Sequence, residues 1–203
     1  MSKQVYISAD YSESEGDREV VEILNKWAED SLHKVDFVDM SKVVSGSVSK
    51  DPDCRICDLK NEFNSQINAS SAVIIVVGDK TATRTAGSEC HRNTKNQDQC
   101  KCTPYKQNRN GTQPCKVKET TTPQENEDLG NINGYSYLQH EFEQAKRKNK
   151  PLIIVYNSKR KETDWLPSYM GNYQESAVPF WITNERGEKV GNYAYIKGAL
   201  GFD

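Results

Sequence analysis

Residues 134–156, GYSYLQHEFEQAKRKNKPLIIVY, carry the signals of a helix that leads directly into a buried strand. Ser136 stands where a helix N-cap is expected, and Gln139 follows three residues later, as in a capping box. A stripe of apolar residues then recurs at helical spacing, namely Leu138, Phe142 and Ala145. The basic turn KRKNK suits the negative end of the helix dipole, and Pro151 cannot continue a helix. The run PLIIVY is continuously apolar and β-branched, which is typical of a parallel strand covered on both faces.

The alternation of strands and helices extends along the rest of the chain. Further runs with the composition of buried strands are KQVYIS (3–8), KVDFVDM (34–40), AVIIVV (72–77) and AVPFWI (177–182). Helical spacing predicts helices in GDREVVEILNKWAED (16–30) and around CDLKNEFNSQINAS (57–70). Residues 161–176 are only weakly helical, and residues 192–201 predict a terminal helix or an irregular tail. This order predicts an α/β domain with a mainly parallel five-stranded sheet and helices on both faces.

The composition limits the classes of function. The chain has 203 residues, enough for one full core, so we expect a single domain over residues 1–203. A formal net charge of −2 gives no sign of a nucleic-acid surface. No apolar run approaches the roughly 18 residues that a membrane span needs, and the amino terminus enters a strand without a secretory signal. We therefore expect a cytoplasmic protein that binds neither nucleic acid nor membrane.

A polar segment interrupts the domain at about residues 79–134. Between Val77 and Leu129 the apolar residues other than cysteine are Ala82, Ala86, Tyr105 and Val117. Such a segment cannot bury enough surface to offset its ordering entropy. We interpret it as an insertion after the third strand that is either mobile or cross-linked.

The cysteines are concentrated in and just before this insertion. They are Cys54, Cys57, Cys90, Cys100, Cys102 and Cys115. The C-x-x-C pair at 54 and 57 together with two further thiolates suits tetrahedral zinc, which would be structural and would supply a cross-link. Disulfides, which the cytosol disfavours, and unlinked thiols are the alternatives, because the spacing matches no standard zinc finger.

Glu141 lies in the second turn of the helix predicted within 134–156. In a doubly wound parallel sheet every strand-to-helix loop opens at the carboxyl edge, where ligands bind. The loops that follow VYIS, DFVD and IIVV lie at this edge, as does the amino end of the helix with Glu141. This position would give Glu141 access to a ligand site. It does not by itself indicate a role, because most glutamates in helices face solvent.

Two blocks of the chain, one on each side of the insertion, together resemble a TIR domain. VYISADYSE (5–13) is similar to the family's first strand and loop, and DFVDM (36–40) to its second strand. INASSAVIIVVGDKTA (67–82) resembles a helix end and the third strand, and YLQHEFEQAKRKNKPLIIVY (137–156) resembles the family's aromatic-x-x-x-Glu helix and following strand. Tyr137 stands where the family usually has tryptophan. The resemblance implies a flavodoxin-like TIR fold, and a short chain of this kind looks most like the NAD-processing subunit of bacterial anti-phage systems such as Thoeris.

In NAD-cleaving TIR domains the glutamate of this motif is catalytic, and Glu141 is the matching residue. The resemblance implies release of nicotinamide and formation of free or cyclised ADP-ribose, or of an ADP-ribose conjugate. It also implies a homo-oligomer or filament when active, and an effector reached through a diffusible nucleotide signal. The residues expected to bind the NAD substrate are Ser8, Asp10, Tyr11, Asp39 and Tyr137. Purely local roles, as a turn residue, a loop cap or a helix staple, stay open for Ser8, Asp39 and Tyr137.

Two other functions remain alternatives. The chain could be a TIR-like scaffold that binds partners without turnover, with the polar loop SKVVSGSVSKDPD (41–53) as its contact surface, because a fold does not determine a function. It could also be an enzyme like the nucleoside deoxyribosyltransferases, which have a related sheet order and also use a glutamate. Product analysis with NAD and with a deoxynucleoside separates the two enzymes.

Overall fold

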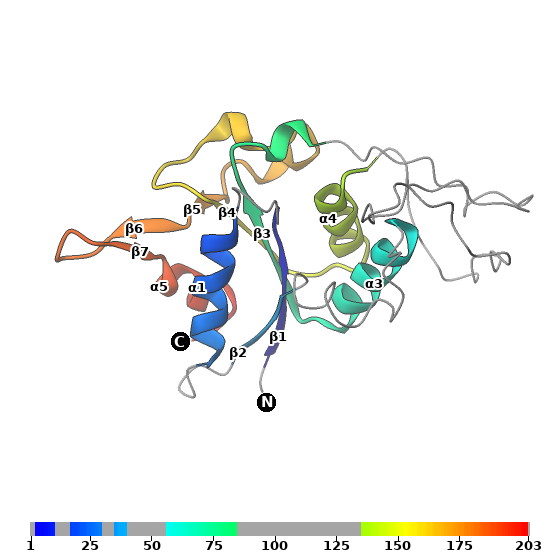
Figure 1. Ribbon diagram of the computed structural model, residues 1–203, viewed down its shortest axis with the longest axis horizontal. Coiled ribbons are helices and arrows are strands. Elements are labelled where there is room, and N and C mark those ends of the chain that lie inside the picture. Colours follow the sequence, from blue (N-terminus) through cyan, green and yellow to red (C-terminus); the bar gives the residue numbers. More distant parts are fainter. Residues whose placement is uncertain (1–2, 11–16, 30–34, 40–55, 85–134, 203) are drawn as a thin grey trace, which may run out of the picture.

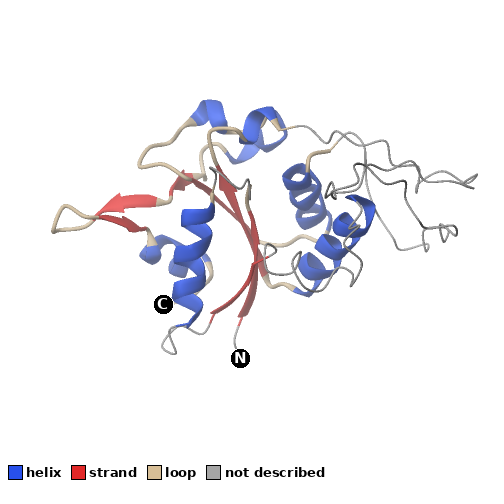
Figure 2. Cartoon of the chain, in the orientation of Figure 1, coloured by secondary structure: helices blue, strands red, loops and turns tan. Residues whose placement is uncertain are grey.

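The computed structural model describes residues 3–10, 17–29, 35–39, 56–84 and 135–202. Its elements form three layers, a parallel sheet with helices on both faces (Figures 1 and 2). The strands of the sheet are β1 (Lys3–Ser8), β2 (Val35–Asp39), β3 (Ala72–Val77), β4 (Leu152–Tyr156) and the two-residue β5 (Val178–Pro179). Helices α1 (Arg18–Glu29) and α5 (Tyr193–Ala199) lie on one face, and α3 (Ile56–Ala69) and α4 (Tyr137–Arg147) cover the other.

The strand order is β2-β1-β3-β4-β5, with every neighbouring pair parallel. This is the order of flavodoxin-like doubly wound sheets, whose switch point lies between β1 and β3. Connections from β1 and from β3 therefore leave toward opposite faces at that point. The α/β architecture and the first four predicted strands are confirmed.

Alternation along β1 divides its side chains between two cores. Val5 and Ile7 pack with α1, while Tyr6 faces α3 and α4. β3 is buried along its whole length, as its continuously apolar sequence predicts. β1 thus presents one set of residues to each helical layer, and its carboxyl end reaches the switch point.

Helix α4 begins and ends as its sequence predicts. The Ser136 side chain accepts a hydrogen bond from the Gln139 backbone N–H at 3.1 Å, so Ser136 is the N-cap. At the other end Asn149 has a φ of 50°. The Lys150 N–H donates to the Ala145 carbonyl and the Asn149 N–H to the Lys146 carbonyl, which is a Schellman motif with asparagine in the left-handed position. Both ends of α4 are therefore fixed by local sequence.

The predicted stripe of α4, with Leu138, Phe142 and Ala145, is buried, but the buried face is wider than predicted. It includes the polar residues His140, Glu141 and Gln144. The reason is that α3 packs beside α4 and covers a second side of the helix, so residues that a solvent-facing helix would expose lie between two helices and the sheet.

The prediction for 177–182 is only partly correct. Val178 and Pro179 pair with β4, but the chain then leaves the sheet, and β6 (Trp181–Thr183) forms an antiparallel hairpin with β7 (Lys189–Gly191). Pro179 has no N–H to continue a ladder, which confines it to an edge. Residues 161–176 form two 3-10 helices, η2 (Thr163–Trp165) and η3 (Ser168–Tyr173), and the predicted terminal helix exists as α5.

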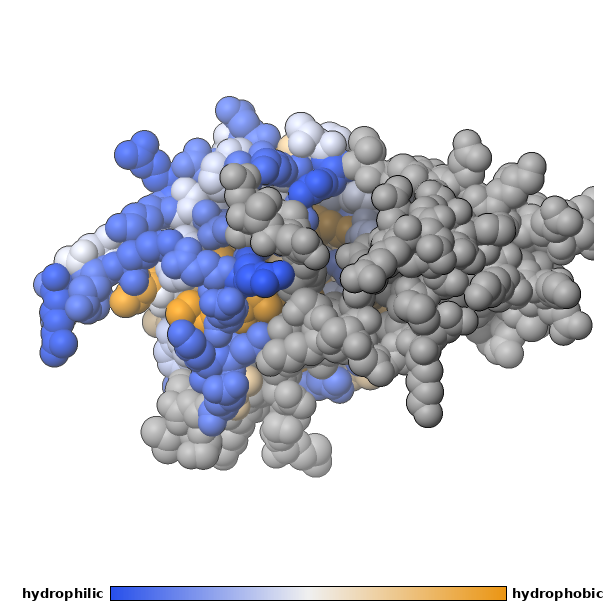
Figure 3. Space-filling view, in the orientation of Figure 1, coloured by the Kyte–Doolittle hydropathy of each residue, from blue (hydrophilic) through white to orange (hydrophobic). Residues whose placement is uncertain are grey.

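The segment after β3 is described only as far as residue 84, where η1 (Thr81–Thr83) forms a short turn. The rest of the predicted insertion lies outside the described residues. Within the described ranges, no helix is long and apolar enough to cross a membrane. The face shown in Figure 3 is largely hydrophilic where residues are described, with small apolar areas.

Candidate functional site

The Glu141 carboxylate lies against the carboxyl end of β1. The Tyr6 hydroxyl donates to its Oε1 at 2.6 Å, and the Ser8 hydroxyl donates to its Oε2. Tyr6 and Ser8 stand two residues apart on one strand, so both point to the α4 face. Glu141 is 5% exposed. A carboxylate of the second turn of α4 is thus held at the carboxyl edge of the sheet, where the sequence predicted it.

Burial raises the pKa of Glu141 to about 7, because the charged form loses its hydration. The hydrogen bonds from Ser8 and Tyr6 and the positive charge of Lys60 act in the opposite direction, but they are weaker than the desolvation. Near neutral pH this carboxylate therefore exchanges readily between its protonated and ionised forms, which suits acid–base or electrostatic work.

The lysine next to this site is fully buried. Lys60 of α3 is 0% exposed, and its Nζ donates to the Tyr135 carbonyl at 2.8 Å. His140 joins the same helix pair, because its Nε2–H donates to Asn64 Oδ1 at 2.9 Å and to the Lys60 carbonyl at 3.2 Å. Both acceptors require the proton on Nε2. These contacts fix α3 against the start of α4 and keep a cation near Glu141.

Tyr137 packs on α3 and lies at the start of α4. Its ring meets Phe63 edge-on with centroids 5.6 Å apart, and Lys60 Nζ lies 5.9 Å from the ring centroid. The contact with Phe63 is an ordinary aromatic pair that stabilises the helix packing. The binding of NAD by Tyr137 stays a prediction.

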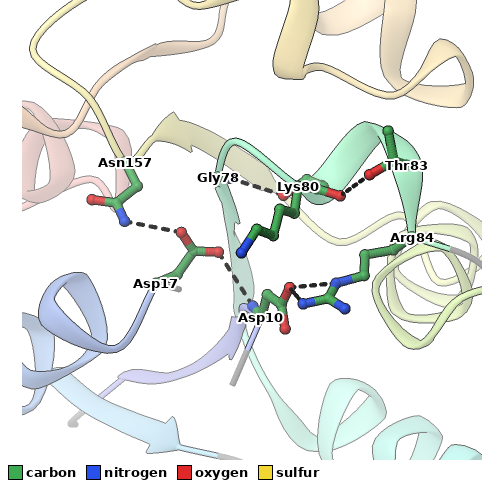
Figure 4. Close-up of polar contacts among 8 residues, drawn as sticks. Asp10, Asp17, Gly78, Lys80, Thr83, Arg84 and Asn157 are labelled. Carbon is green, nitrogen blue, oxygen red and sulfur yellow. Dashed lines mark hydrogen bonds and ion pairs between the residues drawn. The ribbon is translucent and has the colours of Figure 1, made fainter. Parts of the chain in front are cut away.

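A second buried carboxylate lies on the opposite face of the sheet, at the start of α1. Asp17 is 1% exposed (Figure 4). The Asn157 amide donates to its Oδ1 at 3.0 Å, and the Asp10 backbone N–H donates to its Oδ2 at 3.3 Å. The pKa of Asp17 is raised to about 6, chiefly by burial. The hydrogen bonds from Asn157 and Asp10 lower this pKa, and the nearby charges of Asp10 and Asp79 raise it.

Gly78 allows this arrangement. A Cβ at position 78 would lie 2.6 Å from Asp17 Oδ1, closer than van der Waals contact permits. The Gly78 N–H in turn donates to Thr81 Oγ1 at 2.8 Å, which shapes the turn after β3. Asp17 therefore joins the ends of β1, β3 and β4 at the switch point.

Asp10 carries an ion pair beside this group. Its Oδ2 lies 2.6 Å from Arg84 Nε and 2.5 Å from an Arg84 terminal nitrogen (Figure 4). The Asp10 side chain is therefore paired with the Arg84 guanidinium, and the Asp10 backbone N–H is hydrogen-bonded to the Asp17 carboxylate. In Figure 4 the side chain of Lys80 extends back toward the two aspartates.

The structure brings together some of the predicted site residues and separates others. Ser8 and Glu141 are in direct contact, whereas Asp10 belongs to the Asp17 group. Asp39 ends β2 and Cys57 lies in the first turn of α3, but their side chains are not described. The predicted residues that lie outside the described ranges are Tyr11, Cys54, Cys90, Cys100, Cys102 and Cys115.

Sequence reasoning missed four residues of these two groups, namely Tyr6, Asp17, Lys60 and Asn157. The period of two along β1 could have indicated Tyr6, because it places Tyr6 beside Ser8. Asn157 follows β4 at the carboxyl edge, so the edge rule could have indicated it too. In the described part of the chain, no group of three or more His, Cys, Asp or Glu side chains could hold a metal ion.

Comparisons with protein-family models, with curated proteins and with solved structures found no match for this chain.

Proposed function

We propose that this protein is a TIR-like enzyme that cleaves the nicotinamide–ribose bond of NAD, with Glu141 as its catalytic carboxylate. One observation carries the proposal: a buried carboxylate with a pKa raised to about 7 is held by two hydroxyls at the carboxyl edge of a parallel sheet. That edge is where doubly wound folds bind ligands, and perturbed carboxylates gather at functional sites. The motif resemblance adds the substrate.

The reaction needs a negative charge beside the ribose. As the bond between nicotinamide and the anomeric carbon breaks, its electron pair moves to the nicotinamide nitrogen, which neutralises the pyridinium. Positive charge develops on the anomeric carbon and the ring oxygen, and an ionised Glu141 stabilises it. Water then bonds to the anomeric carbon and loses a proton, giving ADP-ribose, or an adenine nitrogen attacks instead and gives a cyclic product.

Ser8 and Tyr6 orient the carboxylate in this proposal. Both hydroxyls donate to Glu141, so they fix its position and favour the ionised form. Ser8, which the resemblance gives as one of the residues that bind NAD, acts through Glu141 in this proposal. The proposal has three further parts. The resemblance alone supports an ADP-ribose-derived signal in anti-phage defence and an active oligomer. The sequence alone supports a structural zinc held by the cysteines.

The test is incubation of concentrated protein with NAD, followed by mass spectrometry of every released species. We expect nicotinamide together with ADP-ribose or an isomer of cyclic ADP-ribose. A parallel incubation with a deoxynucleoside and a free base tests base exchange. Base exchange without nicotinamide release would overturn the proposal in favour of a deoxyribosyltransferase.

A non-catalytic interaction scaffold has one observation in its favour. Both Glu141 oxygens already accept hydrogen bonds from the protein, as in a structural buried carboxylate. A scaffold predicts no nicotinamide release at any protein concentration and the same partner binding in wild type and Glu141→Gln. If the protein is an enzyme, the wild type releases nicotinamide and Glu141→Gln does not.

A further inference from the structure

The hydrogen bonds around Asp17 all have a fixed direction. Trp181 Nε1–H donates to Asn157 Oδ1 at 2.7 Å, so the Asn157 amide must present its NH₂ to Asp17. The indole N–H and the backbone N–H of Asp10 can only donate. Both oxygens of Asp17 are therefore acceptors, and turning the Asn157 amide over would place its NH₂ against the indole N–H.

This geometry is the opposite of the one around Glu141. Tyr6 and Ser8 hydroxyls can rotate to donate or to accept, so Glu141 keeps both partners whether it is ionised or protonated. The donors around Asp17 have no such freedom. A proton on Asp17 finds no acceptor in Asn157 or in the Asp10 N–H, and a neutral carboxyl is the weaker acceptor.

Two hydrogen bonds join the backbone of Asp10 to the start of α1, because the Asp17 N–H also donates to the Asp10 carbonyl at 3.2 Å. We propose that Asp17 is a positioning residue that acts as a proton-operated latch: its ionised carboxylate accepts from the Asp10 backbone N–H, and its protonated carboxyl releases that N–H while the bond to the Asp10 carbonyl remains. The Asp10 contact breaks first because, at 3.3 Å, it is the longer of the two, whereas the Asn157 amide at 3.0 Å is held from behind by Trp181. Asp10 lies two residues beyond Ser8, so the latch controls one of the two hydrogen bonds that hold the chain where it leaves β1 and the Glu141 contact.

The charged groups around Asp17 set the pH at which the latch operates. Asp10 and Asp79 lie close enough to disfavour its ionised form, and Asn157 favours that form. Lys80 extends toward Asp17 and Asp10, and Arg84 neutralises Asp10. With the pKa of Asp17 at about 6, the hydrogen bond from the Asp10 N–H to this carboxylate is present at neutral pH and is lost as the pH falls through about 6.

The latch is a property of the fold and needs no NAD, so its test is separate from that of the proposed function. The experiment follows hydrogen exchange of the Asp10 amide by NMR between pH 4.5 and 8, with rates corrected for intrinsic exchange. We expect Asp10 protection to fall at least tenfold below about pH 6, while the core amides of β3 stay protected. Asp10 protection that does not change with pH would overturn the proposal.

Two substitutions keep the test decisive. Asp79→Asn removes an exposed charge that disfavours ionised Asp17, so the transition should move to lower pH. Asp17→Asn leaves Asp10 unprotected at every pH, and adding Trp181→Phe should partly rescue it, because the Asn157 amide can then turn over. A transition that stays at the same pH in Asp79→Asn, or additive effects in the double variant, would contradict the latch.

Discussion

Two buried carboxylates flank the end of β1, Glu141 on the α4 face and Asp17 on the α1 face. Burial raises the pKa of both, to about 7 and about 6 respectively. Their partners differ in kind, because rotatable hydroxyls surround Glu141 and fixed N–H donors surround Asp17. Glu141 can change protonation without losing its contacts, which suits chemistry, whereas Asp17 cannot, which suits positioning.

The largest effect that separates the two carboxylates is expected on turnover. Glu141→Gln should lower the rate of nicotinamide release a hundredfold or more, because an electrostatic group that stabilises the transition state is lost. The fold should persist, since glutamine still accepts a hydrogen bond from Tyr6 or Ser8. Steady-state release of nicotinamide measures the rate, and circular dichroism checks the fold.

Glu143 is the matched control for that experiment. It lies two residues along α4, about 200° around the helix, where it is partly buried and pairs with Lys146 at 3.8 Å. Glu143→Gln should keep the wild-type rate. An equal loss of rate in both variants would mean that Glu141 has a structural role and not a catalytic one.

A substitution at Gly78 tests how tightly Asp17 is packed. Gly78→Ala places a Cβ 2.6 Å from Asp17 Oδ1, so either the side chain or the β3 turn must move. We expect the free energy of unfolding to fall by about 1–3 kcal/mol, measured by urea denaturation. Gly198→Ala is the control, because nothing lies within 4 Å of that Cβ and alanine favours the α5 helix. Equal effects at the two positions would mean that Asp17 is loosely packed.

Stability should depend on pH in a direction set by both carboxylates. The folded-state pKa of each lies above its ordinary value, so each favours the folded state when protonated. Their joint contribution is complete below about pH 4 and is lost as the pH rises to about 7. We expect the midpoint of urea unfolding to fall across this range and Glu141→Gln to flatten the part between about 4.5 and 7. The urea midpoint of the wild type could instead rise over this interval, with the same slope in Glu141→Gln. That result would contradict the claim that Glu141 is a buried, desolvated carboxylate.

The smallest expected effect comes from the orienting indole. Trp181→Phe removes the donor to Asn157 but keeps an aromatic ring beside Phe180. The lost hydrogen bond should cost about 1 kcal/mol of unfolding free energy. A loss several times larger would show that the ring packing, and not the amide orientation, is the main contribution of Trp181.

The position of Glu141 could be predicted from the sequence, whereas the surroundings of both carboxylates could not. The cap at Ser136, the apolar stripe and the run PLIIVY place Glu141 at the carboxyl edge, because all three signals are local. The buried Lys60 was not predictable, because lysine is rarely buried and its acceptor is a backbone carbonyl 75 residues away. Pro179 agrees with an edge strand, but the early end of β5 depends on pairings that only the folded chain defines. In the sequence, Asp17 has only the signal of an acidic residue at a helix start. Its burial depends on contacts with Gly78 and Asn157, which are distant along the chain.

The pH dependence of kcat/KM for nicotinamide release from NAD shows whether Glu141 works in its ionised form. If ionised Glu141 is the working carboxylate, kcat/KM should rise with pH through a midpoint near 7 and level off above about pH 8. Below the midpoint it should fall by up to tenfold per pH unit, as the ionised fraction does. A kcat/KM that is constant from pH 5.5 to 8, or that rises toward acid, would contradict the claim that Glu141 acts as a buried, ionised catalyst.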